Sequence, residues 1–140
     1  MRFLDTNVFL RYLVVDLPGQ SPRSTELFLT IEQGEEQVQT SQVVILEVIF
    51  TLQKFYRLSL VDIRNQFLPV VQLPGIRLDH KEFLEPAFDL AILKNIGFQD
   101  ALNVVIMKHL GLTEIYSWDR HFDQVDGIQR IEPDTPDPSL

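Results

Sequence analysis

The sequence lacks cysteine altogether, and this absence excludes two kinds of architecture. Without thiols the chain can form neither a disulfide framework nor a cysteine metal site. Its 140 residues are nevertheless enough for one domain that buries a sizeable core. Hydrophobic residues make up 45% of the chain and charged residues 23%, which is the usual balance of a globular protein. We therefore expect a single domain that is stabilised by its core alone.

Long apolar runs are also missing. The segment Met1 to Leu4 is followed at once by an acid, Asp5, and the apolar run from Val8 to Val15 is interrupted by Arg11. Neither segment matches a signal peptide or a membrane span. We expect a cytoplasmic protein.

Basic residues are scarce, with 12 Lys and Arg against 20 Asp and Glu and a formal net charge of −8. A general nucleic-acid binder normally carries a basic face, so this balance argues against one. Two facts weaken the argument. The Pro-rich segment 132–140 contributes three of the acids, and we expect it to be a disordered tail behind a domain that spans residues 1–131. A metal-dependent nuclease also needs carboxylates, which its cations offset.

Short strand-like runs alternate with helical patterns, which is typical of a parallel sheet covered by helices. We expect strands at 3–4, 37–40, 76–78, 115–118 and 129–131. Helices are expected at 8–15, between Ser21 and Gly34, at 43–52, from Ser59 to 68, from Asp79 to 95, and from Asp100 to 110. Predicted N-caps are Ser21 with Pro22 after it, Ser41, Ser59 with Asp62, and Asp79 with Glu82, while Pro86 starts or kinks its helix.

Glu47 is the only charged residue between Val43 and Leu52, in a helix that is apolar on nearly every side. Such a helix is usually buried, and a buried carboxylate needs a cation, a proton or hydrogen bonds. The alternative is that Glu47 lies on a thin exposed stripe and pairs with Lys54. The pattern marks Glu47 as a candidate site residue.

Three aspartates stand at the ends of predicted elements. Asp5 and Asp119 each follow a strand, where ligands of open parallel sheets gather, and Asp100 begins an apolar helix. Taken singly, each is more simply explained as a cap of the helix or turn after it. Two adjacent strands would bring Asp5 and Asp119 together, and two helix ends would add Glu47 and Asp100. We expect these four acids to share one site.

Four carboxylates in one pocket repel one another, and a divalent cation removes that conflict. Sites made only of oxygen ligands suit Mg²⁺ or Mn²⁺. Such ions polarise a phosphoryl oxygen and activate water for in-line hydrolysis, so cleavage of a phosphodiester is the expected chemistry.

The motifs resemble those of the PIN-domain family, especially its VapC-like toxin ribonucleases of type II toxin–antitoxin pairs. The similar stretches are 3–8, 41–50, 98–102 and 117–123, in the expected order and spacing over roughly residues 1–131. The resemblance implies an α/β fold, a three-layer α/β/α sandwich around a central parallel sheet of about four to five strands. It also implies an endoribonuclease that uses one or two Mg²⁺ or Mn²⁺ ions and cleaves single-stranded or structured RNA.

The resemblance assigns roles residue by residue. Asp5, Glu47, Asp100 and Asp119 fall on the acidic quartet that binds metal and catalyses cleavage, and Asp123, Thr6, Asn7 and Ser117 fall on accessory positions.

A cognate antitoxin protein and a homodimer are the implied partners. Independently, Phe9, Tyr12 and Leu13 on one helix and Leu27, Phe28 and Ile31 on the next offer apolar surface for a homodimer. Only Arg11, Arg120 and His121 lie near the motifs as candidate RNA contacts.

Other families fit less well. A haloacid-dehalogenase-like phosphatase needs a second aspartate where Asn7 stands, and a receiver domain needs a late lysine at its site, whereas Lys108 lies in mid-helix. The remaining alternative is a catalytically silent PIN-like module that binds RNA or protein. The intact set of costly acids argues against it, and a test for metal-dependent RNA cleavage separates the two.

Overall fold

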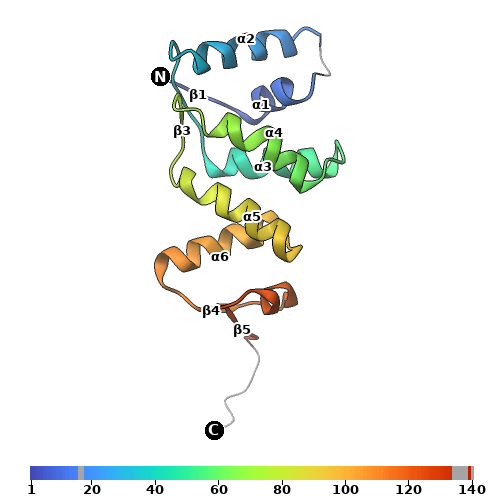
Figure 1. Ribbon diagram of the computed structural model, residues 1–140, viewed down its shortest axis with the longest axis vertical. Helices are drawn as coiled ribbons and strands as arrows, with labels where there is room; N and C mark the ends of the chain where they lie inside the picture. The colour runs from blue at the N-terminus through green and yellow to red at the C-terminus, as the bar shows by residue number, and fades with distance from the viewer. Residues whose placement is uncertain (16–17, 134–138, 140) are drawn as a thin grey trace. The chain divides into compact units, whose positions relative to one another are not determined.

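A computed structural model describes residues 1–15, 18–133 and 139 of the chain (Figure 1). The chain divides into two compact units, Met1–Glu82 and Phe83–Leu140, which are described separately below. Most of the tail that we predicted to be disordered, 134–138 and 140, lies outside the described residues. Within the described part, no helix combines the length and the apolar character that crossing a bilayer requires.

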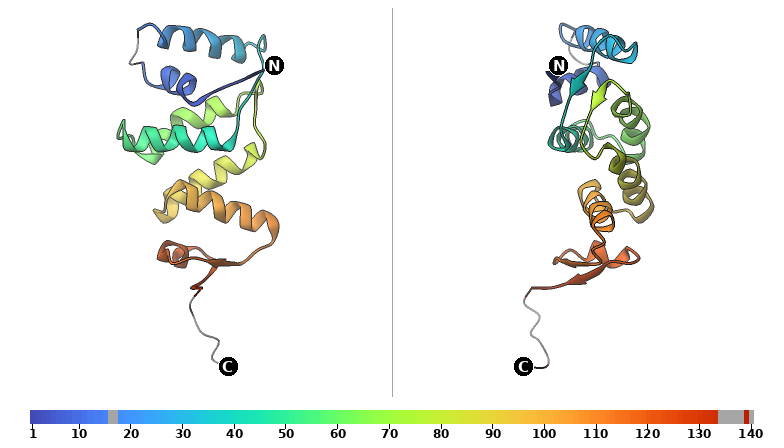
Figure 2. Two further views of the ribbon diagram at one scale, coloured as in Figure 1. Left: turned by 180° about the vertical axis from the view of Figure 1, so that it is seen from behind. Right: turned by 90° about the vertical axis from the view of Figure 1, so that its left-hand side faces the viewer.

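The first unit contains a sheet of three parallel strands in the order β1-β2-β3, and the arrows of β2 and β3 lie side by side in the right-hand view of Figure 2. Two helices connect each pair of neighbouring strands, since parallel strands require a long crossover. The elements are β1 (Arg2–Phe3), α1 (Thr6–Leu13), α2 (Ser21–Glu32), β2 (Val38–Gln39), α3 (Gln42–Lys54), α4 (Leu60–Val71) and β3 (Ile76–Arg77). Because the strands run the same way, their carboxyl ends lie at one edge, where ligands of such sheets bind.

Aromatic rings fill the core of the first unit. Phe9 of α1 contacts Phe28 of α2 and Phe67 of α4, with ring centroids 5.5 and 5.3 Å apart. Tyr12 stacks on Phe28 at 4.4 Å. Such pairs add to the free energy gained by burying the rings. The prediction that these helices offer exposed apolar surface is therefore wrong for Phe9, Phe28 and Ile31, which are at most 2% exposed because α1 and α2 pack against each other. The other three residues named for that surface are partly exposed: Tyr12, Leu13 and Leu27.

Several helix ends follow the sequence signals. The hydroxyl of Ser41 accepts a hydrogen bond from the backbone N–H of Val44, and that of Ser59 accepts one from Asp62. These bonds satisfy N–H groups that the first turn of a helix leaves unpaired. Gly34 and Gly111 adopt the left-handed conformation, Gly34 just after α2 and Gly111 at the end of the last predicted helix. The caps predicted at these positions are confirmed.

Other boundaries differ from the prediction. The first helix begins at Thr6 and not at Val8, because Asp5 already has the extended backbone of an N-cap residue. Gln20, and not Ser21, precedes α2, and the fully buried Ser21 is its first helical residue. The predicted capping pair of Asp79 and Glu82 does not form, since a 3₁₀ turn leads into the following helix and Phe83 is its N-cap residue.

The second unit joins two packed helices to a pair of parallel strands (Figure 1). Its elements are η1 (Lys81–Phe83, which spans the boundary), α5 (Leu84–Lys94), α6 (Phe98–Leu110), β4 (Glu114–Tyr116), η2 (Arg120–Gln124) and β5 (Gln129–Ile131). Phe88 of α5 contacts Phe98 of α6, with centroids 4.5 Å apart. Pro86 lies in the first turn of α5, where its missing N–H is not needed.

All five strands of the described residues are parallel and alternate with helices. The predicted α/β class and its number of strands are therefore confirmed. The strands form two sheets, one in each unit.

Candidate metal centre

Asp5 lies directly beyond the first strand, at the edge where the three strands of its sheet end. The hydroxyl of Thr40, which is 2% exposed, donates a 3.0 Å hydrogen bond to the carbonyl of Leu4 and so fixes the backbone just before Asp5. Asp5 is the N-cap residue of α1, yet its side chain accepts no capping hydrogen bond. The simple explanation that Asp5 serves as a side-chain cap is therefore not supported, and its exposed carboxylate is available to a ligand.

Glu47 lies on α3 and is exposed, which corrects the prediction of a helix buried on every side. Only one face of α3 is buried, the face formed by Val44, Ile45, Val48, Ile49 and Leu52, whereas Val43 and Phe50 are more than 60% exposed. The burial of Glu47 thus cannot explain why an acid stands here. Its Oε2 instead accepts a 3.0 Å hydrogen bond from the hydroxyl of the buried Thr6. Thr6 follows Asp5 directly, so it ties Glu47 to the end of the first strand.

Asp100 is the third residue of α6 and lies partly buried in its first turn. Gly97 takes the N-cap position with no side-chain hydrogen bond, so Asp100 is not the cap that the simple explanation required. Burial raises the pKa of the Asp100 carboxyl above its usual value, and the nearby carboxylate of Asp119 raises it further. His121 acts in the opposite direction. The fold thus holds two acids close together, and their repulsion disfavours the ionised form of Asp100.

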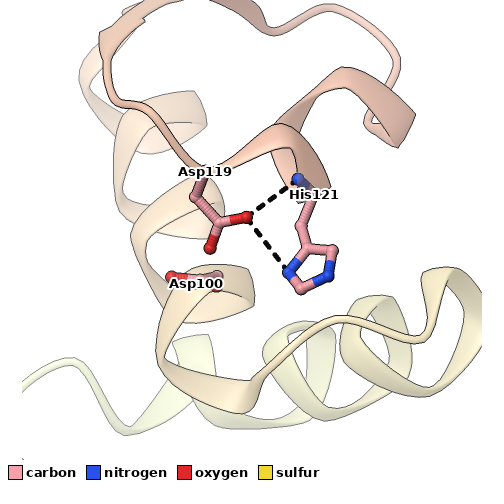
Figure 3. Close-up of side chains that lie close together, drawn as sticks. All are labelled: Asp100, Asp119 and His121. Carbon is pink, nitrogen blue, oxygen red and sulfur yellow. Dashed lines mark hydrogen bonds and ion pairs between the residues drawn. The ribbon is translucent and has the colours of Figure 1, made fainter.

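Asp119 follows β4 and turns back toward Asp100 (Figure 3). Its Oδ1 accepts a 2.9 Å hydrogen bond from the backbone N–H of His121, so the capping role proposed for it is real. The same oxygen lies 3.1 Å from Nδ1 of His121. One ligand atom from each of Asp100, Asp119 and His121 lies within 4.8 Å of the others. Three elements, α6, β4 and η2, therefore converge on one point.

These three side chains fit a divalent cation. The two carboxylates supply the hard oxygen ligands that suit Mg²⁺ or Mn²⁺, whereas the imidazole supplies a borderline nitrogen that suits ions such as Fe²⁺ or Zn²⁺. A bound cation would also relieve the repulsion that raises the pKa of Asp100. The sequence prediction named four acids and placed His121 among the RNA contacts. The spacing of Asp119 and His121, two residues apart across a turn, was the signal that could have grouped them.

Ser117 and Asp123, both predicted as accessory residues, are linked by a residue that the sequence did not single out. Arg130 of β5 donates to both carboxylate oxygens of Asp123, at 3.1 and 3.3 Å, and to the backbone carbonyl of Ser117 at 3.1 Å. It also pairs with Glu132. The hydroxyl of Ser117 in turn accepts a 2.9 Å hydrogen bond from the backbone N–H of Asp119. Arg130 therefore holds the segment that carries Asp119, and the role of Asp123 is to hold Arg130 in place.

The predicted residues thus gather in two places. Thr6 connects Asp5 with Glu47 in the first unit, and Asp100 meets Asp119 and His121 in the second. Asn7 and Arg11 line a pocket beside α1, and Arg120 is exposed at the start of η2. A single site formed by all four acids stays a prediction.

Comparison with known proteins identifies the family of the chain. The PIN domain family matches residues 2–128 of the chain. The chain is also 25% identical, over 136 residues, to a VapC ribonuclease of Aquifex aeolicus (strain VF5), and the match covers 95% of this chain and 97% of that protein. The family match extends over nearly the whole described length and includes Asp5, Glu47, Asp100 and Asp119. The chain therefore belongs to the PIN domain family.

Proposed function

We propose that this protein is a metal-dependent endoribonuclease that hydrolyses phosphodiester bonds in RNA. The observation that supports the proposal most directly is the convergence of Asp100, Asp119 and His121, whose ligand atoms lie within 4.8 Å of one another. The relative from Aquifex aeolicus, which is called a VapC ribonuclease, supports the same activity. The cation would be Mg²⁺ or Mn²⁺.

The role of the cation is to supply positive charge to the phosphoryl group and to the water that attacks it. Asp100 and Asp119 would hold the cation, and His121 either completes the set or keeps Asp119 in place through their 3.1 Å contact. Ser117 fixes the backbone of Asp119. These contacts hold the side chains in position before a substrate arrives, as catalytic groups require.

Asp5 and Glu47 belong to the same reaction in this proposal, which takes that assignment from the family resemblance. The hydroxyl of Thr6 restricts the rotation of the Glu47 carboxylate, because the hydrogen bond occupies one face of Oε2. Exposed glutamates are otherwise mobile, and holding one in place costs conformational entropy. A functional role for Glu47 explains this restraint better than a contribution to the stability of the fold does.

The biological role that we propose is that of the toxin of a toxin–antitoxin pair in the cytoplasm, inhibited by a cognate antitoxin protein. The name of the Aquifex relative and the motifs support this role. We also propose a homodimer, on the family resemblance alone, since three of the apolar residues first suggested for its interface, Phe9, Phe28 and Ile31, are buried in the core of the first unit. Light scattering at micromolar concentration tests the dimer.

Cleavage of a fluorescently labelled single-stranded RNA tests the proposed activity. We expect cleavage with Mg²⁺ or Mn²⁺ and none in excess EDTA. Asp119→Asn should abolish it, whereas Asp126→Asn, a matched change at an exposed aspartate outside the cluster, should not. A purified, folded protein that cleaves no RNA with either ion would support the silent binding module instead.

A further inference from the structure

A pocket of about 340 Å³ lies between α1 and α2 in the first unit. Its polar lining consists of Asn7 and Arg11 from α1, and Gln20, Arg23 and Ser24 from the start of α2. The volume is at the small end of the range for ligand pockets. It suits one compact polar group and its immediate neighbours.

The pocket concentrates positive charge in a chain whose formal net charge is −8. Two of the 12 cationic residues line it, Arg11 and Arg23, and none of the described residues in its lining is acidic. The N-terminus of α2 adds to this charge, because its first turn contains no acid and helix N-termini attract anions. Charge and composition both indicate an anionic ligand.

The arginine on α1 is held in position. Nε of Arg11 donates a 3.2 Å hydrogen bond to Oε1 of Gln20, the residue that precedes α2. This contact joins the last turn of α1 to the first turn of α2 at the pocket wall. A guanidinium restrained in this way loses less conformational entropy when it binds an anion, and its planar fork matches the oxygens of a phosphate.

The pocket shares a helix with a predicted catalytic acid. Asp5 is the N-cap residue of α1, and Asn7 and Arg11 follow on one face of the same helix, four residues apart. Arg11 lies about 9 Å along the helix axis from Asp5, at 1.5 Å per residue, and about 120° round the helix from it, at about 100° per residue. A nucleic-acid strand that places its reacting phosphate at Asp5 would therefore wind round the first turns of α1 to reach the pocket.

We infer that the α1–α2 pocket binds a backbone phosphate of the RNA substrate. The inference rests on the proposed ribonuclease function and names the part of the substrate that this surface recognises. It also explains how an acidic protein grips RNA, because backbone phosphates supply most of the non-specific affinity. An acidic peptide is the other ligand that two arginines would suit, but the proposed ribonuclease function and the match of a guanidinium to phosphate oxygens favour the substrate.

Arg23 is the residue to change, because it is exposed and its loss should not disturb the fold. In the Asp119→Asn background, which prevents cleavage, anisotropy measures the binding of a labelled single-stranded RNA oligonucleotide at several salt concentrations. We expect Arg23→Ala to weaken binding about five- to ten-fold and to make the salt dependence less steep by about 0.7 in log–log slope, the value for one phosphate contact. Arg23→Lys should retain part of the affinity. Lys54→Ala removes the same charge from an exposed position on α3, outside the pocket, and serves as the matched control.

Cleavage by the otherwise unmutated enzyme provides the second measurement. We compare kcat/KM for the oligonucleotide with kcat/KM for a dinucleotide, which has only the scissile phosphate. The ratio of the two should fall about five- to ten-fold in Arg23→Ala. It should not fall in Lys54→Ala.

The outcomes separate this inference from the proposed function. If the unmutated protein cleaves RNA while Arg23→Ala matches Lys54→Ala in affinity, salt slope and ratio, the pocket does not bind RNA and only this inference is overturned. If, in addition, Arg23→Ala lost the ability of the unmutated protein to bind a short oligoglutamate peptide, the pocket would be assigned to an acidic protein. If the unmutated protein neither binds nor cleaves RNA, both proposals fail together.

Discussion

The hydroxyl of Thr6 donates a 3.0 Å hydrogen bond to Oε2 of Glu47, across 41 residues of sequence. Thr6 is 4% exposed and Glu47 is exposed, so a buried residue at the end of the first strand restrains a surface carboxylate on α3. The acid that the sequence marked as buried is thus a surface acid in a fixed position.

Thr6→Val should remove this restraint while it keeps the shape of the side chain. We expect RNA cleavage to fall about ten-fold, equivalent to about 1.4 kcal/mol in the barrier, and the free energy of unfolding to change by about 1 kcal/mol or less. Thr6→Ser should keep both near wild type, because the hydroxyl is retained. Kinetics on a labelled RNA, with thermal melts of each variant, test this; full activity in Thr6→Val would show that the hydrogen bond has no catalytic role.

Glu47→Gln should abolish or strongly reduce cleavage and leave stability within about 0.5 kcal/mol of wild type, as is usual for exposed positions. A buried Glu47 among like charges would have predicted a more stable variant, but its exposure removes the physical reason for that gain. Melting in EDTA decides between the two. A rise in Tm of several degrees would mean that Glu47 is crowded by other acids after all.

Binding of a cation should stabilise the folded protein, because the ligand set is assembled only in the folded state. We expect millimolar Mn²⁺ to raise the Tm of the wild type and to raise that of Asp100→Asn or Asp119→Asn much less. Asp126→Asn provides the comparison, since this acid lies outside the cluster. Equal Tm increases in all four proteins would rule out the Asp100–Asp119–His121 cluster as the metal site.

The pH dependence of stability should report the raised pKa of Asp100. A carboxyl whose pKa is higher in the folded than in the unfolded protein binds more protons when folded, so stability falls as pH rises from the unfolded value, about 3.9, through the folded value. In EDTA at pH 7, Asp100→Asn should therefore melt slightly higher than wild type, on the order of 1–2 °C after allowance for solvent screening. The difference should vanish as pH approaches the unfolded pKa. A variant that melts lower than wild type at pH 7 would contradict this account.

Arg130→Gln should destabilise the second unit, because it removes the partner of Asp123, Glu132 and the carbonyl of Ser117 at once. The Arg130 side chain is only 12% exposed and makes three contacts at once, so we expect a clear fall in Tm. Arg120→Gln, a change at an exposed arginine of η2, should alter Tm little. If the Arg130 variant melted like the Arg120 variant, the network would not stabilise the unit.

The sequence alone was sufficient wherever local chemistry decides the structure. Ser41 and Ser59 cap their helices because a hydroxyl at the N-cap position reaches the first-turn N–H groups within four residues of chain. Gly34 and Gly111 end helices because a residue without Cβ adopts positive φ at little cost. Alternation of strand and helix patterns likewise predicted the α/β class with parallel strands, since that order allows few other arrangements.

Tertiary structure decided which side chains meet. Phe9 and Phe28 formed two separate apolar stripes in the sequence, and only the packing of α1 on α2 showed that each covers the other. Burial of Glu47 was misjudged for the same reason, because composition cannot say which face of an apolar helix finds a partner. The placement of His121 beside Asp119, and of Arg130 between Asp123 and Ser117, depends on side-chain directions across turns and strands. Those directions are set by contacts between residues distant in sequence, which no local pattern records.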